Sequence, residues 1–181
     1  MSFVIVAVMV VGALCALDLV LTLGVVKRLR EHTELLAAGG PVGPSTLGVG
    51  AEVGAFSART VDGQPLSPQR LSGETLVAFF SPTCEPCKAK MPTFVAYART
   101  EPGGREQVLA VVVGEAATAD AFVTELSPVA RVVVEPPGGA LASAFQAQAF
   151  PTILRIARNN DERLVVSDNQ VRLDAPATVA A

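Results

Sequence analysis

The feature that most constrains the fold is a buried strand that leads directly into two closely spaced cysteines. Leu76–Phe80 is a continuous apolar run, the pattern of a central strand that is covered on both faces. Ser81-Pro82-Thr83 interrupts this run, and a helix is predicted from Cys84 to about Thr100. Cys84 and Cys87, separated by two residues, therefore fall at the start of a helix that follows a central strand.

This position suits redox chemistry better than crosslinking. Two intervening residues close so small a loop that a disulfide there gives little entropic stabilisation. Unpaired amides and the dipole at a helix N-terminus favour a thiolate, which is the attacking species. We therefore predict that Cys84 attacks as the nucleophile and that Cys87, one turn later, resolves the mixed disulfide. Pro86 suits an early helix position, and the negative charge of Glu85 partly opposes a thiolate.

Composition argues against several other functions of the chain. Structural zinc normally needs further ligands, but the third cysteine, Cys15, lies in an apolar segment, and the single histidine, His32, follows that segment. We therefore predict no metal site and no cofactor. The net charge of -3, without a basic stripe, argues against a nucleic-acid partner.

The N-terminal segment, residues 1–26, is predicted to anchor the chain in a lipid bilayer. Its apolar run over residues 3–26 would form about 36 Å of helix, enough to cross a hydrocarbon core of about 30 Å. Met1-Ser2 lacks the basic residues of a signal peptide, and the run is longer than the core of one. Residues 27–49 are predicted to form a polar juxtamembrane helix and a flexible linker rich in Gly, Pro and Ser.

The rest of the chain alternates between strand and helix patterns, which indicates an α/β fold with a mixed sheet. The folded domain is predicted over residues 50–167, and a tail over residues 168–181. The domain should open with a small hairpin that turns at Asp62-Gly63. The further predicted strands are Val108–Val113, Arg131–Val134, Thr152–Ala157 and Leu164–Ser167, and the further predicted helices are Ala117–Leu126 and Ala140–Gln146.

Leu76–Thr93, LVAFFSPTCEPCKAKMPT, resembles the active-site strand and helix of thioredoxin-like proteins. It is similar above all to the TlpA/ResA family of membrane-anchored thiol–disulfide oxidoreductases, and to the MauD-like subgroup, whose motif region likewise carries Ser-Pro-Thr-Cys. Pro92 falls where that fold kinks its active-site helix. Phe150-Pro151-Thr152 matches the cis-proline loop that faces the dithiol. The resemblance implies a thioredoxin-like fold that follows one transmembrane helix.

The chain departs from this family's pattern in three places. Thioredoxin carries a buried carboxylate six residues before the first cysteine, where this chain has Ala78, and a tryptophan directly before it, where this chain has Thr83. ResA-like reductases carry a glutamate three residues after the second cysteine, where this chain has Lys90. Proton transfer at Cys87 must then differ. Glu115, in a segment that resembles the family's central strand, is a candidate proton relay or else a solvated strand-end residue.

The resemblance implies a protein thiol–disulfide oxidoreductase that acts on exported, cysteine-containing client proteins. A membrane redox partner would donate or accept the electrons, and the backbone beside Pro151 would pair with an extended client segment. Two alternatives stay open. One is a peroxiredoxin-like thiol peroxidase with Cys84 as its peroxidatic thiol, and the other is a non-catalytic maturation chaperone for a cysteine-containing client.

Two arguments about the side of the membrane oppose each other. Lys27, Arg28 and Arg30 follow the apolar run, and by the positive-inside rule they favour a cytoplasmic domain. Disulfides persist mainly outside the cytoplasm, where the similar proteins of the TlpA/ResA family work. We therefore expect a single-pass protein of the cell membrane with an extracytoplasmic domain.

Overall fold

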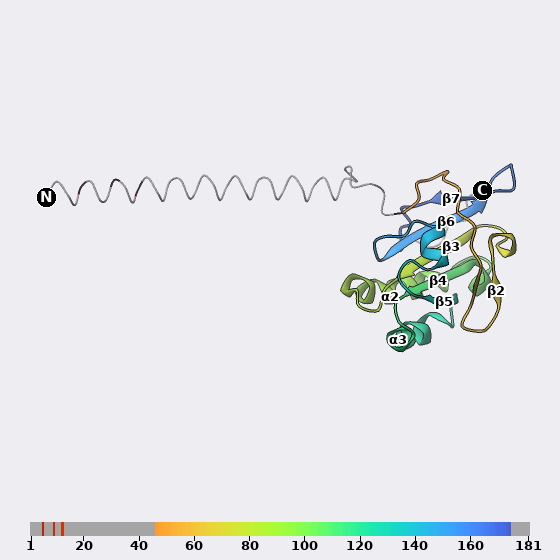
Figure 1. Ribbon diagram of the computed structural model, residues 1–181, viewed down its shortest axis with the longest axis horizontal. Coiled ribbons are helices and arrows are strands. Elements are labelled where there is room, and N and C mark those ends of the chain that lie inside the picture. The colour runs from red at the N-terminus through yellow and green to blue at the C-terminus, as the bar shows by residue number, and fades with distance from the viewer. Residues whose placement is uncertain (1–4, 6–8, 10–11, 13–45, 175–181) are drawn as a thin grey trace. The chain divides into compact units, whose positions relative to one another are not determined.

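The computed structural model describes residues 46–174, together with Ile5, Met9 and Gly12 (Figure 1). Most of the predicted anchor over 3–26, most of the segment over 27–49 and the end of the tail from residue 175 lie outside the described residues. Among the residues that are described, no helix is both long enough and apolar enough to cross a bilayer. Leu47 is already buried in the core of the domain, so packing begins slightly before residue 50.

The domain contains a five-stranded mixed sheet, a small hairpin, and helices on both faces of the sheet (Figure 1). The strand order is β5-β4-β3-β6-β7; β3, β4 and β5 are parallel, and β6 and β7 are antiparallel to their neighbours. These pairings confirm the expected mixed α/β sheet. The strands are β1 (Ala58–Arg59), β2 (Pro65–Leu66), β3 (Thr75–Phe80), β4 (Val108–Val113), β5 (Arg131–Glu135), β6 (Thr152–Arg158) and β7 (Leu164–Asp168), and the helices are α2 (Glu85–Ala98), α3 (Ala116–Leu126), α4 (Ala140–Ala144) and the 3-10 turns Pro68–Arg70 and Gly104–Gln107.

The central strand, β3, is buried along its whole length. Leu76, Ala78 and Phe80 pack into the layer that contains α2 and α3. Val77 and Phe79 pack on the opposite face, into the layer that contains α4. Because both faces are covered, the strand is apolar throughout instead of alternating between apolar and polar residues.

Segments that precede β3 in the chain lie along both edges of the sheet. At the β5 edge, the N–H of Val61, in the turn between β1 and β2, donates to the carbonyl of Val132 at 2.8 Å. At the β7 edge, Glu52 forms an antiparallel bridge with Val165. These contacts occupy backbone groups that would otherwise be open to pairing with another chain.

The ends of two predicted elements differ from the sequence-based expectation. A helix was expected over Ala140–Gln146, but α4 ends at Ala144 because the chain turns at Gln146, whose φ of 51° is left-handed. After β7, Leu173 is buried against the α2 and α3 layer, so part of the predicted tail packs on the domain. Between β7 and residue 174 the described chain contains no helix.

A buried ion pair joins the chain at the end of α2 to β6. Nη1 of Arg155 lies 2.6 Å from Oε1 of Glu101, and Nη2 lies 2.8 Å from both Oε2 of Glu101 and the hydroxyl of Tyr97. The side chains of Arg155 and Glu101 are only 7% and 3% exposed. The hydrogen bond to Glu101 is the main cause that raises the pKa of Arg155, so the guanidinium stays charged. The pair ties the chain directly after α2 to the strand that follows Pro151.

Removing one partner of this ion pair should destabilise the domain. Glu101→Ala leaves the Arg155 charge buried without a counter-charge, which should lower the free energy of unfolding by about 3–5 kcal/mol. Combining Glu101→Leu with Arg155→Met should recover most of that loss, since no buried charge remains. Urea denaturation of the full-length variants measures both effects. A double variant as unstable as the single one would show that the contribution of this site comes from packing and not from charge.

Candidate active site at the start of α2

The turn between β3 and α2 positions Cys84. Its φ of -94° and ψ of 111° are extended, so it occupies the N-cap position directly before α2. The Cys84 Sγ accepts the N–H of Cys87 at 3.3 Å, where a hydroxyl or carboxylate oxygen usually caps a helix. Pro86 lies in the first turn, where a missing N–H costs no helical bond. The expected helix start at Cys84 is therefore confirmed to within one residue.

The sulfur of Cys84 also faces the loop before β6. The Cys84 thiol donates to the backbone carbonyl of Phe150, with 3.4 Å between sulfur and oxygen. The Phe150–Pro151 peptide bond is cis, as the family resemblance implied. Two sequence motifs 66 residues apart thus meet at a partly exposed sulfur.

The second thiol, Cys87, lies in the apolar layer beneath α2. Its side chain is 0% exposed and belongs to the same buried cluster as Phe80 and Met91. The backbone N–H of Ser81 points at its Sγ at 3.5 Å. Burial is the main cause that raises the pKa of Cys87 from 9.0 to about 12; the hydrogen bond with Cys84 adds to the rise, and the Ser81 N–H opposes it. At neutral pH Cys87 is therefore a protonated thiol that is closed off from solvent.

The other residues singled out in the sequence lie at the surface around the dithiol. Glu85 is exposed and pairs with Lys88 at 2.9 Å, a contact in solvent that contributes little stability. Glu115 is exposed at the N-cap of α3. Within the described residues no hydrogen bond joins Glu115 to Cys87, and its role as a proton relay stays a prediction. The same part of the chain contains no group of three or more His, Cys, Asp or Glu that could hold a metal ion.

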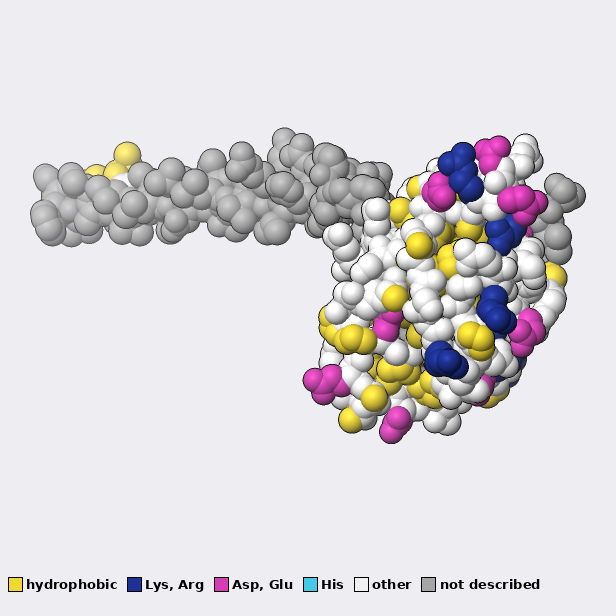
Figure 2. Space-filling model, turned by 45° about the vertical axis from the view of Figure 1, so that its right-hand side comes forward, with side chains coloured by type: hydrophobic (Ala, Val, Ile, Leu, Met, Phe, Trp, Pro, Cys, Tyr) yellow, Lys and Arg dark blue, Asp and Glu magenta, His cyan; other side chains and the backbone are white. Residues whose placement is uncertain are grey.

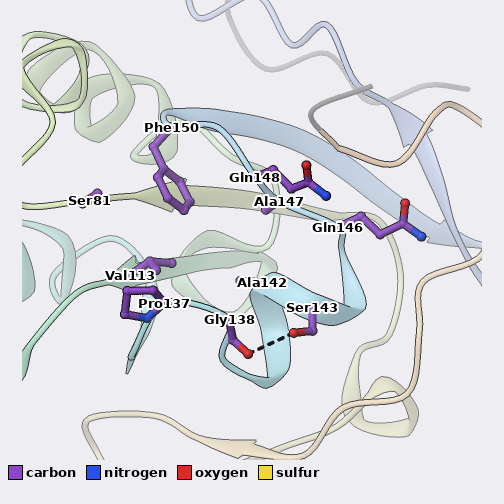
Figure 3. Close-up of a pocket in the computed structure, with 10 residues that line it drawn as sticks. All are labelled: Ser81, Val113, Pro137, Gly138, Ala142, Ser143, Gln146, Ala147, Gln148 and Phe150. Atoms are coloured by element: carbon purple, nitrogen blue, oxygen red, sulfur yellow. Dashed lines mark hydrogen bonds between the residues drawn. The ribbon is translucent and has the colours of Figure 1, made fainter. Parts of the chain in front are cut away.

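A pocket that the sequence did not reveal opens beside the dithiol. Its volume is about 480 Å³, and it lies at the carboxyl ends of β3 and β4, where open α/β sheets commonly bind ligands. Figure 3 shows Phe150 and Ser81 at one end of the pocket, with Gln146 and Gln148 at the other. The lining residues are Ser81, Val113, Pro137, Gly138, Ala142, Ser143, Gln146, Ala147, Gln148 and Phe150. Tertiary folding brings the α4 residues to the dithiol, so no local sequence signal marked them.

A buried carboxylate sets the position of α4, which forms one wall of this pocket. Glu135, the last residue of β5, is 7% exposed and accepts the N–H of Leu141 at 3.0 Å and the N–H of Ala142 at 2.7 Å. These are amides that the first turn of a helix leaves unpaired. A Cβ on Gly139 would lie 2.5 Å from the carboxyl carbon of Glu135, so a glycine is needed for this close approach. Contacts within the domain therefore hold this wall.

Solved structures of other proteins share this architecture. An exposed lipoprotein thioredoxin from Streptococcus pneumoniae is 24% identical, with a TM-score of 0.50 and coverage of 67% of this chain and 93% of that one. A thiol:disulfide interchange protein from Bacteroides sp. is 15% identical, with a TM-score of 0.51 and coverage of 71% and 84%. MTB dsbF, solved in mixed oxidized and reduced forms, is 17% identical, with a TM-score of 0.50 and coverage of 66% and 87%. At these identities the likeness establishes the thioredoxin-like fold alone.

Comparison with whole protein families shows to which family the chain belongs. No curated protein matches the chain. The AhpC/TSA family matches residues 49–162, a span that covers more than half of the sequence. That span includes Cys84, Cys87 and Pro151, the residues that meet at the candidate site. The chain therefore belongs to the AhpC/TSA family and has a thioredoxin-like fold.

Proposed function

We propose that this chain is a protein thiol–disulfide oxidoreductase in which Cys84 attacks the client and Cys87 resolves the mixed disulfide. The observation that carries the proposal is the unequal placement of the two thiols. Cys84 is partly exposed and touches the carbonyl of Phe150 at the cis-proline loop. Cys87 is fully buried behind it, with a raised pKa. Of these two thiols, the partly exposed Cys84 is therefore the one that we assign to the attack on the disulfide of another protein.

The proposed exchange proceeds through one covalent intermediate. In the reducing direction, the Cys84 thiolate forms a bond to one client sulfur, the client S–S bond breaks, and the other client sulfur leaves as a thiolate. Cys87 then attacks the Cys84 sulfur, the bond from that sulfur to the client breaks, and the Cys84–Cys87 disulfide forms. The proton of Cys87 passes to the departing client sulfur, which leaves as a thiol. Two electrons pass from the protein to the client. The oxidising direction is the reverse sequence.

The two alternative activities make different demands on the same residues. A thiol peroxidase with Cys84 as its peroxidatic thiol would consume peroxide, and a maturation chaperone would bind its client without either thiol. The short distance along the chain from Cys84 to Cys87, together with the Phe150 carbonyl at the Cys84 sulfur, favours exchange with a disulfide. Three measurements separate these activities. They are the reduction of insulin, the consumption of peroxide, and the binding of a client by a variant in which both cysteines are changed to serine.

Cys87→Ser should trap mixed disulfides with clients, because the thiol that resolves them is absent. Reduced full-length protein is incubated with a disulfide-bonded client such as insulin, quenched with acid and resolved on a non-reducing gel. Covalent adducts should accumulate through Cys84 and disappear on treatment with dithiothreitol. The matched control is Cys84→Ser, which keeps the buried thiol and should give few adducts. Equal adduct yields from the two variants would contradict the proposed roles.

The proposal extends to the family subgroup of the chain and to its location in the cell. The TlpA/ResA family, with its MauD-like subgroup, is supported by the sequence Ser81-Pro82-Thr83-Cys84 before α2. Membrane attachment is supported by the apolar run over residues 3–26, which is long enough to span a bilayer. On this proposal the domain is extracytoplasmic, its clients are exported cysteine-containing proteins, and a membrane redox partner exchanges electrons with its dithiol.

The proposed topology predicts which cysteines can be labelled in intact cells. After mild reduction, a membrane-impermeant maleimide should label Cys84, while Cys15 stays protected within the bilayer. Cys84→Ser serves as the control, because it should remove the label. Labelling that occurs only after the membrane has been opened would place the domain in the cytoplasm. That result would agree with the positive-inside rule, by which Lys27, Arg28 and Arg30 favour a cytoplasmic domain. The proposal that the clients are exported proteins would then be wrong.

A further inference from the structure

Gln146 occupies a backbone position that usually belongs to glycine. Directly after α4, the N–H of Ala147 donates to the carbonyl of Ala142 at 2.9 Å, and the N–H of Gln146 donates to the carbonyl of Ser143 at 3.2 Å. This pair of bonds is the Schellman motif, in which the residue after the helix cap adopts a left-handed conformation. Gln146 does so, with a φ of 51°. Any side chain there is strained relative to glycine, so a glutamine at this position points to a role for its amide.

The side chain of Gln146 lies at the pocket beside the dithiol. Gln146 and Gln148 are both exposed and both line the pocket. Figure 3 shows their amides extending in the same direction at the edge of the pocket, away from the ring of Phe150. A primary amide both donates and accepts hydrogen bonds. Two such amides can therefore bind the backbone or an uncharged polar side chain of an extended segment.

The pocket as a whole suits an uncharged ligand. None of the ten described residues that line it is charged. The nearby carboxylate of Glu135 is already bound by the amides of Leu141 and Ala142 at the start of α4. A carboxylate or ammonium that entered the pocket would lose hydration without gaining a counter-charge, which is unfavourable.

The pocket adjoins the site of exchange. Phe150 lines it, and the carbonyl of the same residue touches the Cys84 sulfur at 3.4 Å. A client that is disulfide-bonded to Cys84 therefore has the pocket within reach of the residues that flank its cysteine. We propose that this pocket is the subsite for an uncharged segment next to the client cysteine and that Gln146 binds this segment through its amide. The inference rests on the proposed exchange activity and names the class of client sequence that the site accepts.

Peptide selectivity tests the subsite. Reduced full-length protein is mixed with short peptides that carry one cysteine as an activated mixed disulfide, flanked by uncharged residues, by Asp or by Lys. Release of the activating group gives the second-order rate constant for each peptide. We expect the uncharged peptide to react about tenfold faster than either charged one, because a charge is desolvated without a partner.

Introducing a negative charge into the pocket should separate the reaction rates of the two charged peptides. Ser143 is exposed, and its hydroxyl donates to the Gly138 carbonyl at 3.0 Å. Ser143→Asp should make the Lys peptide react several-fold faster than the Asp peptide. The matched control is Thr124→Asp on α3, an exposed position whose hydroxyl donates in the same way to the Asp120 carbonyl. This control should leave the Lys and Asp peptides equally slow, and a faster Lys peptide in both variants would overturn the assignment.

Gln146→Gly separates the role of the side chain from that of the fold. Glycine relieves the left-handed backbone, so Tm should rise by a few degrees. The rate with the uncharged peptide should nevertheless fall by roughly threefold to tenfold, as expected for one lost hydrogen bond. Unchanged rates in Gln146→Gly, or equal rates with all peptides in the unmodified protein, would overturn the proposal while leaving the exchange activity intact. Failure to react with any peptide would instead overturn the proposed function itself.

Discussion

The burial of β3 on both faces is the constraint on which the rest of the structure depends. Its side chains enter two separate apolar layers, so the strand cannot shift without disturbing both. The chain leaves β3 at Phe80 and reaches the first turn of α2 within five residues. Cys84 is consequently fixed at the N-cap, and Cys87 is directed into the layer beneath α2. The unequal exposure of the two thiols follows from this geometry.

Buried carboxylates hold the elements on either side of the dithiol. Glu101, which follows α2, binds Arg155 in β6, and Cys84, directly before α2, contacts Phe150 in the loop before β6. Glu135 binds the first amides of α4 and holds the wall of the adjacent pocket. Each carboxylate is bound by several donors, as buried charges must be to offset their desolvation. The site thus combines a rigid frame with one accessible sulfur.

The sequence predicted those features that depend on local pattern. The apolar runs of β3 and β4 indicated buried strands, and the helix after Ser81-Pro82-Thr83 was predicted to within one residue of its start. The pocket was not predictable, because tertiary contacts bring α4 to it, among them the bonds from the helix amides to Glu135. The early end of α4 was also missed, since a left-handed Gln146 carries no glycine signal. Hydrogen bonds between residues far apart in the chain leave no local pattern by which a single sequence could reveal them.

The most direct test of the unequal thiols is alkylation of the reduced full-length protein with iodoacetamide at increasing pH, followed by peptide mass spectrometry. At about pH 7 the reagent should modify Cys84 and leave Cys87 unmodified, because the Cys84 side chain is partly exposed and the Cys87 side chain is fully buried. Cys87 should become reactive only in strongly alkaline solution, since burial raises its pKa to about 12. Equal modification of both cysteines near neutral pH, or modification of Cys87 first, would contradict the proposed division between attacking and resolving thiols.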